Sequence, residues 1–153
     1  MIKMRMLLLL CLAALCFPVS LTAQSNSLID MLLEEDEADW EKTVFLVLSA
    51  AGIMGEDQEP ADALPVLEQQ NWMSADKAPG DTISLGELSY LLMQAFEVRG
   101  GLMYRLFPGP RYAARELAYL NLLEEDTSPY RTVSGDETLR ILGGVMEWKE
   151  AQQ

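Results

Sequence analysis

The chain contains no histidine, and its two cysteines, Cys11 and Cys16, both lie near the N-terminus. Imidazole carries most acid–base chemistry near neutral pH and binds most zinc and iron sites, so its absence argues against both kinds of enzyme. The sequence also has neither a Gly-rich phosphate loop after a strand nor a Gly-x-Ser-x-Gly elbow. We therefore predict a protein that is not an enzyme and has no cofactor or metal site. Catalysis by paired carboxylates is the enzymatic alternative.

Basic side chains are scarce, because 11 Lys and Arg stand against 24 Asp and Glu and give a formal net charge of −13. Without Lys3 and Arg5, the remaining 9 basic and 24 acidic side chains give a net charge of −15. Nucleic-acid binding needs a broad basic surface that displaces phosphate counterions. We therefore expect no nucleic-acid partner, and the negative charge favours solubility.

The longest apolar run lies at the N-terminus. Lys3 and Arg5 precede apolar residues 7–17, and small and polar residues follow. This layout is typical of a secretory signal peptide. We predict that residues 1–23 are removed by cleavage after Ala23, which leaves a chain without cysteine and therefore without disulfides or thiol chemistry.

Two features of the same N-terminal segment bear on membrane attachment. The apolar run is too short for a membrane-spanning helix, which needs about 20 residues, so we expect no transmembrane span. An alternative interpretation makes Cys16 a lipidated first residue, because Ala13, Ala14 and Leu15 loosely resemble a lipoprotein cleavage box. Such a lipid anchor would tether the same domain without changing its fold.

An internal repeat is the most informative pattern in the sequence. Residues 62–98 laid over residues 112–148, at an offset of 50 without a gap, are identical at ten of 37 positions. Such self-similarity indicates a duplicated supersecondary unit. We predict one helical domain, residues 24–153, in which the linker 99–111 joins the two repeats and residues 28–54 form a degenerate repeat or cap. The identical pairs are Ala63/Ala113, Leu67/Leu117, Asn71/Asn121, Asp76/Asp126, Pro79/Pro129, Thr82/Thr132, Ser84/Ser134, Glu87/Glu137, Leu92/Leu142 and Glu97/Glu147.

Each repeat has the pattern of a helix, a proline-containing loop and a second helix. Ser84 with Glu87, and Ser134 with Glu137, have the spacing of a capping box that opens the second helix. The fold class is therefore predicted to be all-α, with a short extended pairing around Ile83 and Val133. We expect helices near residues 28–52, 62–73, 85–98, 111–123 and 136–150.

The two repeats resemble the S-layer homology (SLH) repeat. The resemblance rests on a helix with an aromatic-alanine opening, Tyr112-Ala113, in RYAARELAYLNLLEED, followed by the start of a second helix in TVSGDETLRIL. The matching stretches of the first repeat are PADALPVLEQQNWM and TISLGELSYLL. The resemblance implies a bundle of three repeats with pseudo-threefold symmetry. It also implies attachment of an exported protein to an anionic cell-wall polymer, often a pyruvylated glycan, through grooves between repeats.

The sequence departs from the SLH pattern at one position. The second helix of an SLH repeat usually begins Thr-Arg-Ala-Glu, and the arginine contacts the polymer. Here the second helices of the two repeats begin with Ser84-Leu85-Gly86-Glu87 and Ser134-Gly135-Asp136-Glu137, without the arginine.

Residues 98–115, which we call the arginine segment, contain no acidic residue and hold four of the nine basic residues outside the signal peptide. Arginine forks match carboxylates and phosphates, and aromatic rings can lie against sugars. Our hypothesis is an inter-repeat groove for an anionic glycan or an acidic protein tail. In the alternative, the arginines pair with the protein's own acids and the aromatic rings pack under the linker. The predicted site residues are Arg99, Arg105, Arg111, Tyr104 and Tyr112.

Together these patterns predict a non-catalytic binding or attachment domain of the periplasm or cell envelope. The expected partner is a cell-wall polymer. The alternative is an accessory or scaffolding protein that binds another exported protein through its apolar helical faces.

Overall fold

The computed structural model describes residues 22–55, 57–72, 77–78, 80–124 and 126–152, and only the backbone of residues 22–26. The predicted signal peptide and Cys16 lie outside the described residues, except that Thr22 and Ala23 begin the first described helix. The described chain is mostly helical, which confirms the all-α class. None of its helices is long and apolar enough to cross a membrane.

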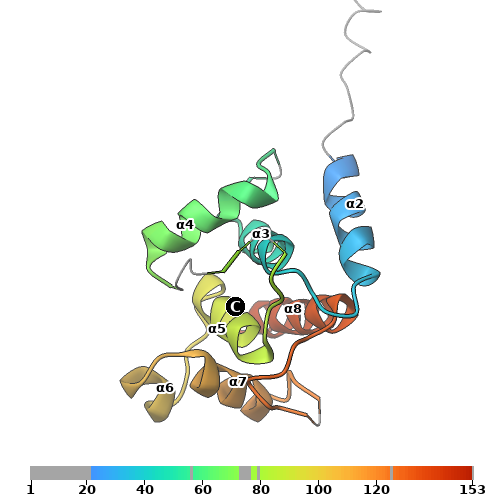
Figure 1. Cartoon of the computed structure of the whole chain (residues 1–153). Coiled ribbons are helices and arrows are strands. Elements are labelled where there is room, and N and C mark those ends of the chain that lie inside the picture. The colour runs from blue at the N-terminus through green and yellow to red at the C-terminus, as the bar shows by residue number, and fades with distance from the viewer. Residues whose placement is uncertain (1–21, 56, 73–76, 79, 125, 153) are drawn as a thin grey trace, which may run out of the picture.

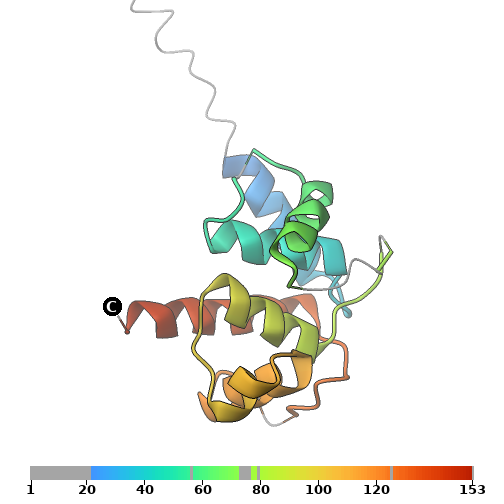
Figure 2. The same cartoon turned by 90° about the vertical axis from the view of Figure 1, so that its left-hand side faces the viewer.

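The helices form three consecutive pairs, with one short helix between the second and third pairs (Figures 1 and 2). In each pair a loop leads from a peripheral helix to a helix that contributes many buried residues. The pairs are α2 (Thr22–Leu33) with α3 (Trp40–Ala50), α4 (Ala63–Gln70) with α5 (Leu85–Ala95), and α7 (Pro110–Tyr119) with α8 (Gly135–Glu150). The 3-10 helix η1 (Pro60–Asp62) precedes α4, and α6 (Leu102–Leu106) lies between α5 and α7.

The single helix expected over residues 28–52 is wrong, because the chain forms α2 and α3 with a loop between them. The first helix ends at Leu33, and Asp39 starts the second: it has extended backbone, and its carboxylate accepts a hydrogen bond from the Lys42 amide at 2.9 Å. Residues 28–54 are therefore most of a helix–loop–helix pair. The predicted linker 99–111 also differs, since it contains α6 and the start of α7.

Asparagine ends two of the peripheral helices. Asn71 follows α4 with φ 53°, and Asn121 lies just past the end of α7 with φ 58°, both in the left-handed region that asparagine tolerates. These helices stop at residues 70 and 119, short of the predicted 73 and 123. The Asn71/Asn121 identity in the repeat therefore marks the left-handed conformation that ends α4 and α7.

Three buried residues join the pairs through a closed ring of backbone hydrogen bonds. The Ala38 amide donates to the Val133 carbonyl at 2.7 Å, and the Val133 amide donates to the Ile83 carbonyl at 3.3 Å. The Ile83 amide completes the ring by donating to the Ala38 carbonyl at 3.0 Å. The ring confirms the predicted pairing of Ile83 with Val133 and adds Ala38 from the first pair.

A second cycle of backbone bonds starts the three inner helices. The first residue of each helix donates its amide to a carbonyl in the loop of another pair. These amides have no acceptor within their own helix, so a carbonyl of the neighbouring loop accepts their hydrogen bond. The three bonds are Trp40 to Asp81 at 2.8 Å, Leu85 to Arg131 at 2.8 Å and Gly135 to Glu35 at 3.0 Å.

Ser84 and Ser134 are the N-caps of α5 and α8. Ser84 and Glu87 form a full capping box, in which the Glu87 carboxylate accepts from the Ser84 amide at 2.8 Å. At the second site the Glu137 amide donates to the Ser134 hydroxyl at 3.2 Å, but the Glu137 carboxylate binds Arg131 at 2.5 and 2.7 Å. Among the described contacts this box is therefore half formed, because the arginine holds the carboxylate that would complete it.

Helix packing follows the same cyclic order. Helix α4 packs on α3, α7 packs on α5, and α2 returns to pack on α8, so each peripheral helix covers an inner helix of another pair (Figure 1). Trp40 is 1% exposed and anchors this core at the start of α3. All these contacts lie within residues 22–152, so this part of the chain closes its own core.

Gly135 lies where α8 approaches α2 most closely. A Cβ atom at this position would lie 1.6 Å from the Leu32 carbonyl oxygen, a backbone atom that cannot move without shifting α2. We expect Gly135→Ala to lower the free energy of unfolding by about 1–3 kcal/mol, as overpacking does. Urea unfolding followed by circular dichroism measures the change.

Gly143 in the same helix provides the control, because its added Cβ would meet nothing within 4 Å. Gly143→Ala should raise the free energy of unfolding by about 0.5–1 kcal/mol, since alanine restricts the unfolded chain. Equal stabilities of the two variants would contradict the close approach at Gly135.

Candidate functional site

The arginine segment crosses from the end of α5 through α6 to the first half of α7. Gly101 precedes α6 in extended conformation, and Pro110 occupies the first turn of α7, where its missing amide costs no helical hydrogen bond. Figures 1 and 2 show α6 and α7 on the side of the molecule opposite α2 and α4. The segment therefore forms one outer edge of the domain.

The four arginines of this segment are exposed, and none makes an ion pair with a described residue. This arrangement contradicts the alternative in which they pair with the protein's own acids, as far as the described residues extend. The other described cations all bind protein groups: Lys42 binds Glu35, Lys77 binds Glu87, Arg131 binds Glu137, Arg140 binds Glu124, and Lys149 donates to the Phe96 carbonyl. The arginine segment thus holds the unpaired positive charge of the described chain.

Tyr104 anchors α6 to α5. Its side chain is 7% exposed, its hydroxyl accepts a hydrogen bond from Gln94 Nε2 at 2.9 Å, and its ring lies 6.3 Å from that of Tyr90. Burial raises the pKa of the Tyr104 phenol to about 12, because the phenolate would lose hydration. Tyr104 therefore holds α6, which carries Arg105, against α5, and its buried ring is not available to a ligand.

Tyr112 is half-buried at the start of α7. Its ring stacks on Phe107, with centroids 6.3 Å apart and ring planes 29° apart. Phe107 itself is exposed and Tyr112 packs against the core, so this pair links the surface of α6 to α7. The aromatic part of the predicted site is mainly structural.

The predicted arginines are divided between two shallow pockets. Arg99 and Arg105 line one of about 490 Å³ together with Tyr104. Arg111 lines a second, of about 560 Å³, with Arg115 and Tyr130. The structure thus brings two of the three predicted arginines into one pocket and places the third in another.

Arg115 and Tyr130 were not among the predicted site residues. Arg111 and Arg115 are four positions apart in a helix that begins at Pro110, and this spacing alone puts them on one face. Tyr130, 80% exposed, belongs to the loop between α7 and α8, and no local pattern in the sequence indicates that this loop lies beside Arg111.

A pocket of about 710 Å³ beside the start of α8 contains both arginines and acids. Arg131 is bound by Glu137, and this hydrogen bond raises the pKa of Arg131. Arg140 lies 3.1 Å from Glu124. Because these cations are neutralised by carboxylates, the pocket is a poor site for an anion.

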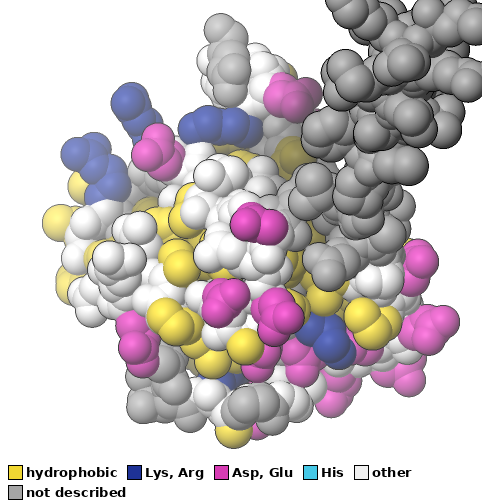
Figure 3. Space-filling view, turned by 90° about the horizontal axis from the view of Figure 1, so that it is seen from above, with side chains coloured by type: hydrophobic (Ala, Val, Ile, Leu, Met, Phe, Trp, Pro, Cys, Tyr) yellow, Lys and Arg dark blue, Asp and Glu magenta, His cyan; other side chains and the backbone are white. Residues whose placement is uncertain are grey.

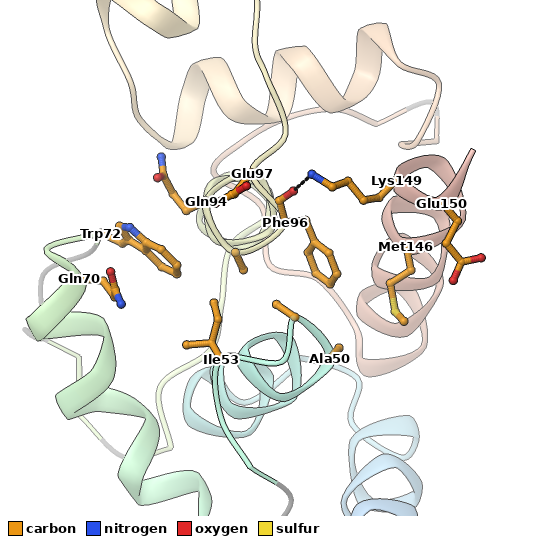
Figure 4. A pocket seen from close by; sticks show the side chains of 12 residues that line it. Ala50, Ile53, Gln70, Trp72, Gln94, Phe96, Glu97, Met146, Lys149 and Glu150 are labelled. Carbon is orange, nitrogen blue, oxygen red and sulfur yellow. Dashed lines mark hydrogen bonds between the residues drawn. The ribbon is translucent and has the colours of Figure 1, made fainter. Parts of the chain in front are cut away.

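The pocket in Figure 4 lies at the C-terminal ends of the three inner helices and has a volume of about 590 Å³. Its apolar walls include Ile53, Trp72, Phe96 and Met146. Lys149 Nζ donates to the Phe96 carbonyl at 2.7 Å and caps the end of α5. The remaining lining includes Gln70, Gln94 and Glu97, so this pocket combines apolar walls with a polar rim and differs from the basic pockets of the arginine segment.

The charged surface away from the arginine segment is mainly acidic. The view from above Figure 1 shows acidic side chains scattered across one face, with most of the basic ones gathered toward one edge (Figure 3). Within the described part of the chain no three acidic side chains converge in a way that could hold a metal ion. The exposed arginines of the two basic pockets are suited to binding an anion.

Alkaline unfolding tests the anchoring role of Tyr104. Above a pH of about 10 the unfolded chain loses a phenol proton that the folded chain retains. Stability should therefore fall as the pH rises toward the folded-state pKa of about 12. Tyr104→Phe should weaken this fall, as measured by urea unfolding between pH 8 and 11. Tyr119→Phe, at a side chain 82% exposed, is the control, and an equal pH dependence of the two variants would contradict the buried phenol.

Comparison with models of protein families, with curated proteins and with solved structures finds no match to this chain. A functional interpretation therefore depends on the chain's own residues and geometry.

Proposed function

We propose that the chain is an exported, non-catalytic attachment domain whose arginine segment binds an anionic glycan of the cell envelope. The observation that carries the proposal is the set of four exposed arginines without an ion pair to a described residue, in a protein of net charge −13. Guanidinium groups that pair with no acid of the protein keep their hydrogen-bond donors available for a carboxylate or phosphate. An external anionic ligand would supply such a group.

The fold supports the resemblance to SLH repeats. Three helix–loop–helix pairs close in a cycle, in agreement with the pseudo-threefold bundle that the resemblance implies. The position of the usual polymer-binding arginine is occupied by Leu85 in α5 and by Gly135 in α8, and both residues are buried. A ligand would thus need cations from another element, and the arginine segment supplies them.

A polymer suits the arrangement of the charges. The two pockets each contain two arginines, and both lie along the edge formed by α6 and α7. A chain with repeated negative groups could contact both pockets, whereas a small anion would occupy one. The acidic remainder of the protein would repel such a polymer and restrict binding to this edge.

Export is supported by the N-terminal sequence, in which Lys3 and Arg5 precede the apolar residues 7–17. Cleavage after Ala23 would release the domain into the periplasm or to the cell surface, and acylation of Cys16 would anchor it. Either route brings the arginine segment to the envelope polymers.

A second candidate function is that of an accessory protein for another exported protein. The pocket with apolar walls at Ile53, Trp72, Phe96 and Met146 favours it, since these walls can accept apolar side chains of a partner (Figure 4). A stoichiometric partner released by substitutions in this pocket, and not by loss of the arginines, would support this function.

Co-sedimentation with purified cell-wall sacculi tests the attachment role. The chain of residues 22–153 retains every described contact, and its binding should weaken with added salt because exposed charges are screened. The triple change Arg99→Ala, Arg105→Ala and Arg111→Ala should lower the affinity at least tenfold, since each charge-assisted contact contributes about 1.5 kcal/mol or more.

The matched control is the triple change Lys42→Ala, Arg140→Ala and Lys149→Ala, which removes the same net charge from cations already bound to protein groups. It should bind sacculi nearly as well as the unchanged chain. Equal losses in the two triple variants, or no binding at low salt, would reject the arginine segment as the wall-binding site.

A further inference from the structure

Helix α6 and the residue after it expose four large apolar side chains. Leu102 is 70% exposed, Met103 53%, Leu106 60% and Phe107 62%. We call these four residues the α6 tip. Isolated exposed apolar side chains are common on proteins, but four within six residues form a contiguous patch that signals an interaction surface.

The tip projects from the domain on a fixed support. Tyr104 lies under α6 and is held by Gln94, and Phe107 stacks on Tyr112 at the start of α7. Both cartoon views place α6 at the periphery, beside α7 and away from α2 and α4 (Figures 1 and 2). A rigid protruding apolar surface needs either a matching cavity in a partner or a soft medium that it can enter.

Positive charge without an ion pair to a described residue lies within the tip and beside it in the sequence. Arg105 lies within α6, Arg99 shares a pocket with it, and Arg111 directly precedes Tyr112. None of these arginines pairs with a described acid. Guanidinium groups form paired hydrogen bonds with phosphates. Apolar side chains and arginines able to bind phosphate therefore lie together at one edge.

We propose that the α6 tip docks on an anionic lipid bilayer. Leu102, Met103, Leu106 and Phe107 enter the boundary between headgroups and acyl chains, while Arg99, Arg105 and Arg111 bind lipid phosphates. An anionic bilayer suits this edge because it has negative phosphates next to an apolar layer. The arginines would contact the phosphates, and the tip would contact the apolar layer. It also accepts a convex surface without a preformed cavity.

The acidic remainder of the domain sets the orientation. Without Lys3 and Arg5 the net charge is −15, so an anionic surface repels the other faces and favours approach by the edge that carries the arginines. The lipid contact goes beyond the proposed glycan attachment, since that attachment is made by the arginines and does not use the aliphatic side chains of the tip. Together the two contacts would hold the domain between the membrane and the wall.

Vesicle flotation tests the proposal. Residues 22–153, which leave out the apolar N-terminal run, should float with vesicles of 30% phosphatidylglycerol in phosphatidylcholine and not with pure phosphatidylcholine. Leu102→Ser, Leu106→Ser and Phe107→Ser combined keep every arginine and should lower the partition coefficient at least tenfold. Each arginine removed singly should lower it about fivefold. Leu33→Ser with Tyr119→Ser, two exposed positions outside the tip, is the control and should bind unchanged.

A fluorescent label reports insertion without removing the whole patch. Both native cysteines precede residue 22, so Leu106→Cys gives a single attachment point for an environment-sensitive dye. Its emission should shift to the blue on anionic vesicles, and that of Tyr119→Cys should not. Equal emission changes at the two sites, undiminished flotation of the tip variant, or self-association through the tip in place of vesicle binding would overturn the proposal.

The two attachment proposals can be rejected independently of each other. The tip variant retains all its arginines and should still sediment with lipid-free sacculi. Vesicle binding without sacculus binding would reject the glycan site and leave the lipid contact standing. Sacculus binding without vesicle binding would reject the lipid contact alone.

Discussion

Three backbone hydrogen bonds between Ala38, Ile83 and Val133 close the chain into a ring, and the rest of the domain is arranged around it. Each ring residue directly precedes the N-cap of an inner helix, so the ring sets where α3, α5 and α8 begin and how they converge. The first amide of each helix then bonds a loop of another pair. Since buried backbone groups must be paired, the helices can start in these places only when all three pairs are present.

The same constraint explains the close approach at Gly135. The third inner helix starts against the Leu32 carbonyl of the first pair, at a distance that leaves no room for a side chain. Packing of α2 on α8 thereby joins the two ends of the described chain. The outer edge at α6 and α7 takes no part in the ring, and it carries exposed arginines whose charge would be costly to bury nearer the core.

Paired and unpaired charges lie in different parts of the domain. Around the ring, acids and cations neutralise each other: Lys77 binds Glu87, Lys42 binds Glu35 and Arg131 binds Glu137, each close to the start of an inner helix. For Glu87, burial tends to raise the pKa, but hydrogen bonds from Lys77 and Ser84 outweigh it and lower the pKa. The arginine segment lacks partners of this kind among the described residues, so its charge is directed outward.

Local sequence determined the helical class, the serine caps and the asparagine ends of two peripheral helices, because each depends on residues within a few positions of one another. It also located the arginine segment from the absence of acids in residues 98–115. The first pair left little trace in the sequence, since Ala38 joins the ring through backbone atoms that any residue possesses. Only the tertiary structure decided that the arginines are unpaired among the described residues, that Tyr104 is buried and that Arg111 lies beside Tyr130, because each depends on which distant segments the ring brings together.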